Sequence, residues 1–403
     1  MEIVSIEGLY RTSNRLVAQT SANFHRYMYD KISWEAWLIA IKGARGTGKT
    51  TMMLQRIKEE FKSNPQKALY ISLDNLWFKT HSLSEVVEYH YSHGGTHLFI
   101  DEIHKYENWQ TLIKNIADEY PDLHVVYTGS SMLKIDQNEA DLSRRQLVYT
   151  LPGLSFREYL SFENVLDKPA IALDDLLANH QRYAMEISNE IKTLPFFETY
   201  LKTGYYPFYK RDKAGFGQRL QAVIRTILYE DLPAVEDVTY ETVRKTERMM
   251  MILAEHKPQT PNMNELYGQL DTNRNQGLKM LYLLERAALI NILSSEAKST
   301  KHLAKPDKIF MNNTNLMFAL TASNNTGTVR EVFFDNQLAA ADNEVNYPKQ
   351  GDFLVNHKYL FEIGGRSKTF EQIKDIPDSY LAIGDIETSH GNRIPLWLFG
   401  FLY

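Results

Sequence analysis

A glycine-rich segment at residues 43–51 contains the residue types that bind a phosphate chain. Its sequence, Gly43-Ala44-Arg45-Gly46-Thr47-Gly48-Lys49-Thr50-Thr51, fits the pattern G-x-x-x-x-G-K-[ST]. The backbone N–H groups of such a loop point at phosphate oxygens, and its lysine reaches the β- and γ-phosphates. We therefore predict that these nine residues bind a nucleotide. Lys49 would contact the phosphates, and the Thr50 hydroxyl would be a ligand of Mg²⁺.

The elements that flank this loop fit the same interpretation. Residues 37–41 are a short apolar run, which predicts a buried strand, and residues 51–57 have apolar side chains at helical spacing. A helix that begins directly after the loop directs its N-terminal N–H groups and its dipole at the phosphates. The order strand, loop, helix therefore strengthens the predicted nucleotide site.

A second apolar run, at residues 96–100, ends in Asp101 and Glu102. A carboxylate at the tip of such a strand can hold the magnesium ion, and a second carboxylate can polarise the attacking water. We assign the first role to Asp101 and the second, catalytic role to Glu102. The expected cofactors are therefore ATP and Mg²⁺, with hydrolysis at the bond between the β- and γ-phosphates.

Two further assignments follow from position along the chain. The apolar run at residues 123–128 precedes Gly129-Ser130-Ser131, and a serine there can contact the γ-phosphate, although an ordinary turn explains the same residues equally well. Arg144 and Arg145 precede another apolar run, and a cation there can neutralise charge that develops on the γ-phosphate. We take Ser130 as the nucleotide contact and Arg145 as the catalytic cation.

The composition excludes several classes of protein. The chain has 403 residues, 43% of them hydrophobic, and no cysteine, so disulfides, cysteine-ligated metals and thiol catalysis are excluded. No secretory signal and no apolar run of about 20 residues is apparent, so we expect a cytoplasmic location and no membrane partner. The net charge of −5 means that any contact with nucleic acid would need a local basic patch.

The pattern of elements predicts an α/β chain with a P-loop parallel-sheet core. We place its parts at residues 1–34 (helical lead-in), 35–165 (ATPase core), 166–245 (helical connector), 246–300 (winged helix-turn-helix) and 301–403 (small α/β domain). Within them we expect helices over residues 104–120 and 369–376 and a strand over residues 396–399.

The winged-helix hypothesis rests on three helical segments followed by an apolar run at residues 288–293. The third segment contains Arg274, Asn275, Gln276 and Lys279, which suit a DNA major groove. The alternative is a winged helix that only packs against protein, and the acidic chain favours this alternative slightly.

The chain resembles prokaryotic AAA+-type ATPases that carry a C-terminal domain of uncharacterised function. The motifs that carry the resemblance are residues 43–51, 98–102, 128–131, 361–366 and the string Leu154-Ser155-Phe156-Arg157-Glu158-Tyr159-Leu160. The resemblance implies binding of ATP and ADP together with ATP hydrolysis. It names no substrate, so the protein client stays unidentified.

The C-terminal residues also resemble nucleases of the PD-(D/E)xK type. Glu331 on a predicted helix, with Asp352 and Glu362 on predicted strands, matches the acidic positions, and the resemblance implies that they form a second metal site. Gly364 stands where the lysine of Glu-x-Lys belongs, and Lys368 is four residues further on. We therefore expect the fold to be kept with little or no nuclease activity.

Three functions follow from these observations. In the first, ATP hydrolysis drives rearrangement of the winged-helix and C-terminal parts. In the second, the ATPase gates a metal-dependent nuclease. The third is a nucleotide-binding regulator with negligible turnover. Gly364 and the acidic composition favour the first function over the second, and Glu102 favours it over the third.

Overall fold

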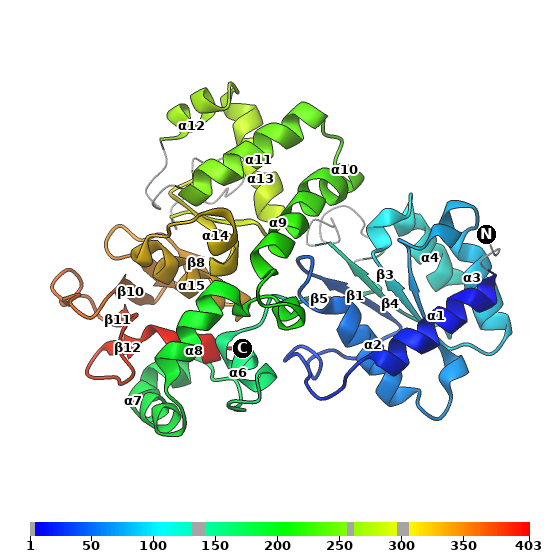
Figure 1. Ribbon diagram of the computed structural model, residues 1–403, viewed down its shortest axis with the longest axis horizontal. Coiled ribbons are helices and arrows are strands. Elements are labelled where there is room, and N and C mark those ends of the chain that lie inside the picture. The colour runs from blue at the N-terminus through cyan, green and yellow to red at the C-terminus, as the bar shows by residue number, and fades with distance from the viewer. Residues whose placement is uncertain (1–4, 131–141, 143, 256–261, 296–305) are drawn as a thin grey trace. The chain divides into compact units, whose positions relative to one another are not determined.

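The structure, a computed structural model, describes residues 5–130, 142, 144–255, 262–295 and 306–403. The chain forms two compact units (Figure 1). Unit 1 consists of residues 1–152 and 231–237, and unit 2 consists of residues 153–230 and 238–403.

Unit 1 is built on a parallel sheet with the strand order β2-β3-β4-β1-β5. The strands are β1 (Leu38–Lys42), β2 (Ala68–Ser72), β3 (His97–Asp101), β4 (His124–Gly129) and β5 (Leu147–Thr150). The four strands β1 to β4 are almost entirely buried, as a parallel sheet with helices on both faces requires. This arrangement confirms the predicted α/β class and its parallel-sheet core.

Helices cover both faces of this sheet (Figure 1). Side chains of α3 (Leu83–Ser92) and α4 (Trp109–Glu119) pack on one face, and those of α2 (Lys49–Glu60) pack on the other. The other α-helices in the described part of unit 1 are α1 (Ile6–Gln19) and α10 (Leu232–Val235). The two apolar layers hold the sheet rigidly, so residues at the carboxyl ends of its strands keep fixed positions.

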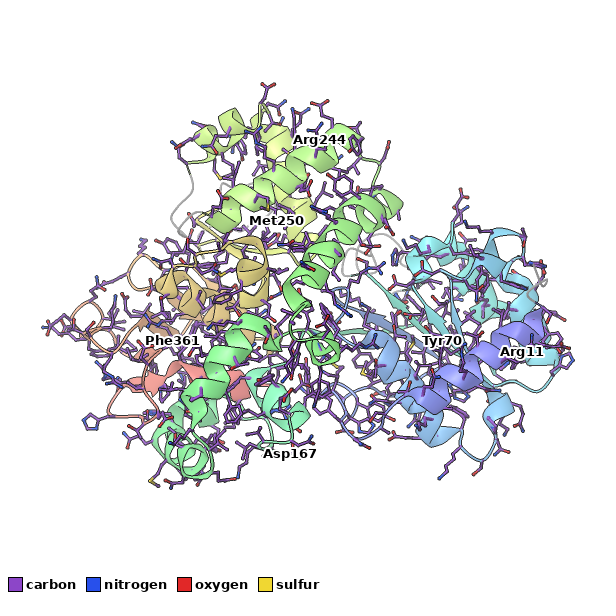
Figure 2. All side chains as sticks on the ribbon, viewed as in Figure 1. Arg11, Tyr70, Asp167, Arg244, Met250 and Phe361 are labelled. Atoms are coloured by element: carbon purple, nitrogen blue, oxygen red, sulfur yellow. The ribbon has the colours of Figure 1, made fainter. Side chains whose placement is uncertain are left out.

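Helix α1 is part of unit 1, whereas the sequence suggested a separate lead-in over residues 1–34. Leu9 of α1 is buried among the side chains of one sheet face. The hydroxyl of Ser13 accepts a hydrogen bond of 3.1 Å from the backbone N–H of Tyr70, a buried residue of the edge strand β2 (Figure 2). The helix therefore covers the β2 edge of the sheet. The first segment of unit 1 ends at Pro152, where residue 165 was expected.

The predicted helix over residues 104–120 is shorter in the structure. Residues Ile103–Lys105 form a single 3-10 turn, and Asn108 has a φ of 55° in the left-handed region. A right-handed helix cannot continue through that conformation, so α4 begins only at Trp109. The start of the predicted helix is wrong because no proline or glycine marks the break.

Unit 2 begins with helices and ends with a mixed sheet, and its division does not reproduce the expected boundaries at residues 245 and 300. Its helices are α6 (Phe156–Phe162), α7 (Leu173–Glu190), α8 (Thr193–Thr199), α9 (Phe216–Thr226), α11 (Tyr240–Glu255), α12 (Met263–Gln269), α13 (Arg274–Arg286), α14 (Thr314–Leu320) and α15 (Thr326–Ala340). Strand β6 (Ile290–Leu293) pairs antiparallel with β7 (Lys308–Met311). Helices α11 to α13 and this strand pair follow one another in the order that the winged-helix hypothesis requires.

The C-terminal sheet has the strand order β12-β11-β10-β9-β8. Its strands are β8 (Val345–Asn346), β9 (Phe353–Val355), β10 (Tyr359–Gly364), β11 (Ser379–Ile383) and β12 (Arg393–Pro395). Strands β10 to β12 are parallel, and β8 and β9 run antiparallel at the other edge. Phe361 on β10 is fully buried and contacts Phe334 of α15, with ring centroids 4.9 Å apart (Figure 2).

Two predicted elements of this region are wrong. Residues 369–376 form consecutive turns instead of a helix, with N–H groups of Ile373 and Ile376 bonding three residues back. The buried run Leu396–Phe401 is a 3-10 helix instead of a strand. In both segments the apolar residues pack into the core as expected, but apolar spacing alone does not fix the backbone conformation.

Candidate functional site: a phosphate loop beside two carboxylates

Residues 43–48 connect β1 to α2 in a conformation that needs glycine. Gly46 and Gly48 have φ values of 88° and 102°, in the region that side chains disfavour. At Gly43, an added Cβ would lie 2.4 Å from the carbonyl oxygen of Leu151. Helix α2 begins at Lys49, and no side chain caps its N-terminus. The first N–H groups of α2 are therefore directed where phosphate oxygens can accept them.

Lys49 lies inside this loop. Its ammonium donates to the carbonyls of Gly43, at 2.7 Å, and Ala44, at 3.0 Å, and the residue is buried. Burial lowers the pKa of Lys49, and the nearby carboxylates of Glu102 and Asp101 oppose this shift. A buried ammonium that is hydrogen-bonded to neutral carbonyls is stabilised when an anion approaches. Lys49 is therefore suited to contact a phosphate group.

Asp101 ends β3 and is the centre of a cluster of hydroxyl groups. Its carboxylate accepts hydrogen bonds from the hydroxyls of Thr50, at 2.6 Å, Tyr70, at 2.8 Å, and Thr128. Asp101 itself is 4% exposed. The structure therefore brings together the two predicted magnesium ligands, Thr50 and Asp101, although 51 residues separate them.

The donor set fits a magnesium ion that is shared with a nucleotide. Mg²⁺ prefers oxygen ligands and is commonly held by one or two carboxylates together with substrate phosphates and water. The hydroxyl of Thr50 and the carboxylate of Asp101 supply such oxygens. Within the described part of the chain there is no group of three or more His, Cys, Asp or Glu side chains arranged to hold a metal on its own.

Glu102 follows Asp101 in an uncommon backbone conformation. Its φ of 58° places it in the left-handed region, which is disfavoured for residues other than glycine, and such conformations cluster at functional sites. Its backbone N–H donates to the hydroxyl of Thr128 at 3.3 Å. Burial raises the pKa of Glu102, and the nearby Lys49 and His104 side chains oppose this effect.

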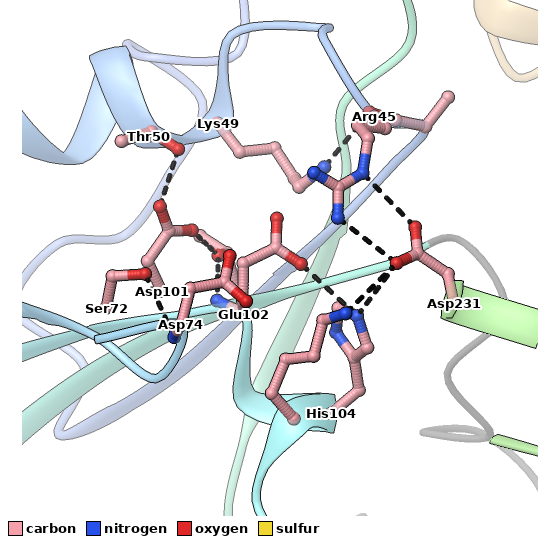
Figure 3. A network of polar contacts seen from close by, with 12 residues as sticks. Arg45, Lys49, Thr50, Ser72, Asp74, Asp101, Glu102, His104 and Asp231 are labelled. Atoms are coloured by element: carbon pink, nitrogen blue, oxygen red, sulfur yellow. Dashed lines mark hydrogen bonds and ion pairs between the residues drawn. The ribbon is translucent and has the colours of Figure 1, made fainter. Parts of the chain in front are cut away.

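A third carboxylate, which sequence reasoning missed, lies in the same network (Figure 3). Asp231 is 2% exposed and accepts two hydrogen bonds from the Arg45 guanidinium, at 3.1 and 3.3 Å. His104 Nε2 is 3.7 Å from Asp231 Oδ1 and 3.2 Å from Glu102 Oε2. The sequence around Asp231 shows only an acid before Leu232-Pro233, a common start of a helix, so no signal pointed to the loop.

The remaining residues that were predicted to contact the nucleotide differ in burial and in their partners. Ser130 is buried and directly follows β4, whose last residue, Gly129, pairs with Lys42 at the end of β1. Ser131 lies outside the described residues. Thr51 is exposed on the first turn of α2, and Arg45 is held by Asp231. Arg145 forms an ion pair with Asp118 of α4, so its expected role at the γ-phosphate has no support from its contacts.

Unit 2 contains the carboxylates of the predicted second metal site, with two lysines among them. Lys308 Nζ is 2.9 Å from a carboxylate oxygen of Glu331 and 3.7 Å from one of Asp352. Lys368 pairs with Glu362. Burial raises the pKa of Glu331, Lys308 lowers it, and Asp352 and Glu362 raise it further. The three acids therefore lie close enough to interact, but lysines neutralise them.

The glycine at position 364 has a specific consequence for Lys368. A Cβ at residue 364 would lie 2.5 Å from Cβ and 2.6 Å from Cγ of Lys368. The Lys368 stem therefore occupies the space that a side chain at 364 would fill. The Arg393 guanidinium fixes this loop because it donates to the carbonyls of Lys368 and Arg366, both at 2.8 Å.

Comparison with known proteins agrees with the geometry of unit 1. Residues 36–160 match the family model described as an AAA domain. This segment is therefore similar to AAA-type P-loop domains. Residues 195–327 match the model of a domain of unknown function.

Two uncharacterised proteins of Methanocaldococcus jannaschii are similar in sequence. MJ1637 is 25% identical over 287 residues, which cover 68% of this chain and 60% of MJ1637. MJ1544 is 23% identical over 351 residues, which cover 83% of this chain and 73% of MJ1544. The chain thus spans about three fifths of the length of MJ1637.

Solved structures with partial likeness include DnaA from Aquifex aeolicus bound to AMPPCP, with 16% identity and a TM-score of 0.26. The alignment covers 71% of this chain and 92% of that DnaA chain. PCH-2 of C. elegans has 17% identity and a TM-score of 0.23, with 48% of this chain and 60% of PCH-2 covered. These scores are too low to support any conclusion about activity. No helix in the described ranges is long and apolar enough to cross a membrane.

Proposed function

We propose that unit 1 binds ATP with Mg²⁺ and hydrolyses it, and that the nucleotide cycle rearranges unit 2. The observation that carries this proposal is the convergence of Thr50, Asp101 and Lys49 at the carboxyl ends of β1 and β3, two strands of one parallel sheet that are separated by β4. The loop supplies N–H groups and one ammonium for the phosphates. Thr50 and Asp101 supply oxygens for the metal, and Glu102 supplies a carboxylate that can accept a proton from water.

When bound, Mg²⁺ would neutralise charge on the β- and γ-phosphates. The protein's own residues bind the phosphates and activate the attacking water. The loop holds the phosphate chain in place, and Lys49 keeps a positive charge beside it. Glu102 orients a water molecule for attack on the γ-phosphate and takes its proton. Because Glu102 is largely buried, few other water molecules compete for that position.

Glu102→Gln tests the catalytic part of this proposal. The amide keeps the shape of the side chain but loses its basicity, so ATP binding should persist while turnover falls by about 10²- to 10⁴-fold. Phosphate release at steady state and calorimetric titration with ATP measure the two quantities. Glu107→Gln, an exposed residue of the same loop, is the matched control and should behave as wild type. Wild-type turnover in Glu102→Gln would contradict the assignment.

The chain passes between the two units at residues 152–153, 230–231 and 237–238. Any movement of residues 231–237 is therefore transmitted along the chain in both directions. This connectivity supports coupling of nucleotide state to unit 2. Hydrogen exchange of unit 2, compared with and without ATP in Glu102→Gln, tests it. Identical exchange throughout unit 2 would refute the coupling but leave ATP hydrolysis intact.

A second candidate function is metal-dependent cleavage of nucleic acid by unit 2. The observation in its favour is the Lys368 ammonium, which reaches Glu362 across the space left by Gly364. Against it, Lys308 lies between Glu331 and Asp352, where a metal would bind. We therefore propose that activity is absent or very low. Plasmid and single-stranded DNA with Mg²⁺ or Mn²⁺ test this, and cleavage that disappears in Asp352→Ala would establish the nuclease.

A further inference from the structure

The segment Asp231–Asp237 interrupts unit 2 and folds with unit 1. It continues directly from α9 of unit 2 through a π-helical stretch, Ile227–Asp231, into the short helix α10. Helix α10 packs against the 3-10 turn Ile103–Lys105, which directly follows Glu102. A chain that comes from unit 2 thus places one carboxylate, that of Asp231, inside the nucleotide-binding unit.

Asp231 has more cationic neighbours than one ion pair requires. Arg45 binds both of its oxygens, and Lys105 Nζ and His104 Nε2 lie 3.6 and 3.7 Å from Oδ1. Burial alone would raise the pKa of Asp231, but the nearby His104 and Arg45 side chains outweigh this effect, so the pKa lies well below its ordinary value. The carboxylate is therefore a permanent negative charge.

His104 connects this charge to Glu102. Its side chain is completely buried, and the same ring nitrogen, Nε2, faces Glu102 at 3.2 Å and Asp231 at 3.7 Å. Among the described residues, neither ring nitrogen of His104 has a hydrogen-bond partner of good geometry. The two carboxylates are therefore what compensates the burial of this imidazole and fixes its orientation (Figure 3).

We propose that Asp231 is a positioning residue for ATP hydrolysis, which holds the Glu102 carboxylate in place through His104. The inference rests on the proposed function of unit 1. It follows that Asp231 acts on turnover and not on ATP affinity, because it touches neither Lys49 nor Thr50 in the contacts described above. Its pairing with Arg45 restrains a second cation of the phosphate loop, beside Lys49. Release of Arg45 should therefore leave ATP affinity unchanged or higher.

The test compares Asp231→Asn with Asp237→Asn, an exposed residue of the same segment. Asp231→Asn should lower kcat by about 10- to 100-fold, the usual effect of losing a residue that orients a functional side chain. Its Kd for MgATP should stay the same or decrease. Asp237→Asn should match wild type in both. A merely structural role would instead impair binding and turnover together.

His104→Gln provides the second variant. Because Asp231 acts through His104, His104→Gln should show the same loss of kcat, and the double variant should be no slower than the worse single variant. Wild-type turnover in Asp231→Asn, additive losses in the double variant, or a raised Kd would each refute the positioning role. No phosphate release by the wild type would refute the proposed function itself, and the positioning role with it.

Discussion

Asp101→Asn is expected to destabilise unit 1 by about 3.5–5 kcal/mol, apart from any effect on magnesium. Hydrogen bonds to a charged group contribute about 1.5–3 kcal/mol each, and bonds between neutral groups about 0.5–1.5 kcal/mol. Thr50 and Tyr70 both donate to Oδ2, and an amide oxygen there still accepts them, with a loss of about 1 kcal/mol each. Thr128 would face the amide NH₂ group. Its hydroxyl donates to the carboxylate and cannot donate to an NH₂ group, so this third bond is lost.

Urea unfolding followed by tryptophan fluorescence measures this loss. Four of the five tryptophans lie in unit 1, so the signal reports mainly on that unit: Trp34, Trp37, Trp77 and Trp109. Asp122→Asn, an exposed acid, is the control and should change stability by less than about 0.5 kcal/mol.

Tyr70→Phe tests one of these hydrogen bonds separately. It removes one donor to the carboxylate, so it should cost less in the Asp101→Asn background than in wild type. A loss below about 1 kcal/mol for Asp101→Asn, or additive effects of the two changes, would refute the idea that the carboxylate organises these hydroxyls.

Three further predictions concern other parts of the chain. Lys49→Ala should weaken ATP binding by about 10- to 150-fold or more, because one charge-assisted contact is worth about 1.5–3 kcal/mol; calorimetric titration decides, with exposed Lys62→Ala as control. The wild type should bind duplex DNA no more tightly than about 10⁻⁶ M at physiological salt. A tighter, salt-sensitive complex that is weakened by Arg274→Ala with Lys279→Ala would contradict this, as measured by fluorescence anisotropy. Burial raises the pKa of Asp335 to about 6 from 3.8, so wild-type stability should fall as the pH rises through about 4 to 6. The stability of Asp335→Asn relative to wild type should therefore grow by about 3 kcal/mol between pH 4 and pH 7, and a difference that is independent of pH in urea unfolding would disprove the shift.

The sequence was sufficient to predict the secondary structure wherever the backbone conformation follows from local chemistry. The glycines at 46 and 48 permit the positive φ values that the phosphate loop needs. The buried runs of β1 and β3 fit a parallel sheet that is covered on both faces. It was insufficient at Asn108, whose left-handed conformation shortens α4, and in the run Leu396–Phe401, which is buried but helical. In such segments tertiary packing selects the backbone conformation, and apolar content reports only that the segment is buried.

The residues of the candidate site also fall into two groups, those that the sequence could place and one that it could not. Lys49, Thr50, Asp101 and Glu102 lie at the ends of β1 and β3, two strands of one parallel sheet, so their meeting could be expected from topology. Asp231 is 186 residues from Arg45 along the chain. It contacts the loop because the chain leaves unit 2 after residue 230 and folds with unit 1 over residues 231–237. No local pattern encodes that return. The residue that we propose as a positioning residue is therefore the one that no sequence pattern indicated, because its contacts in unit 1 are distant along the chain.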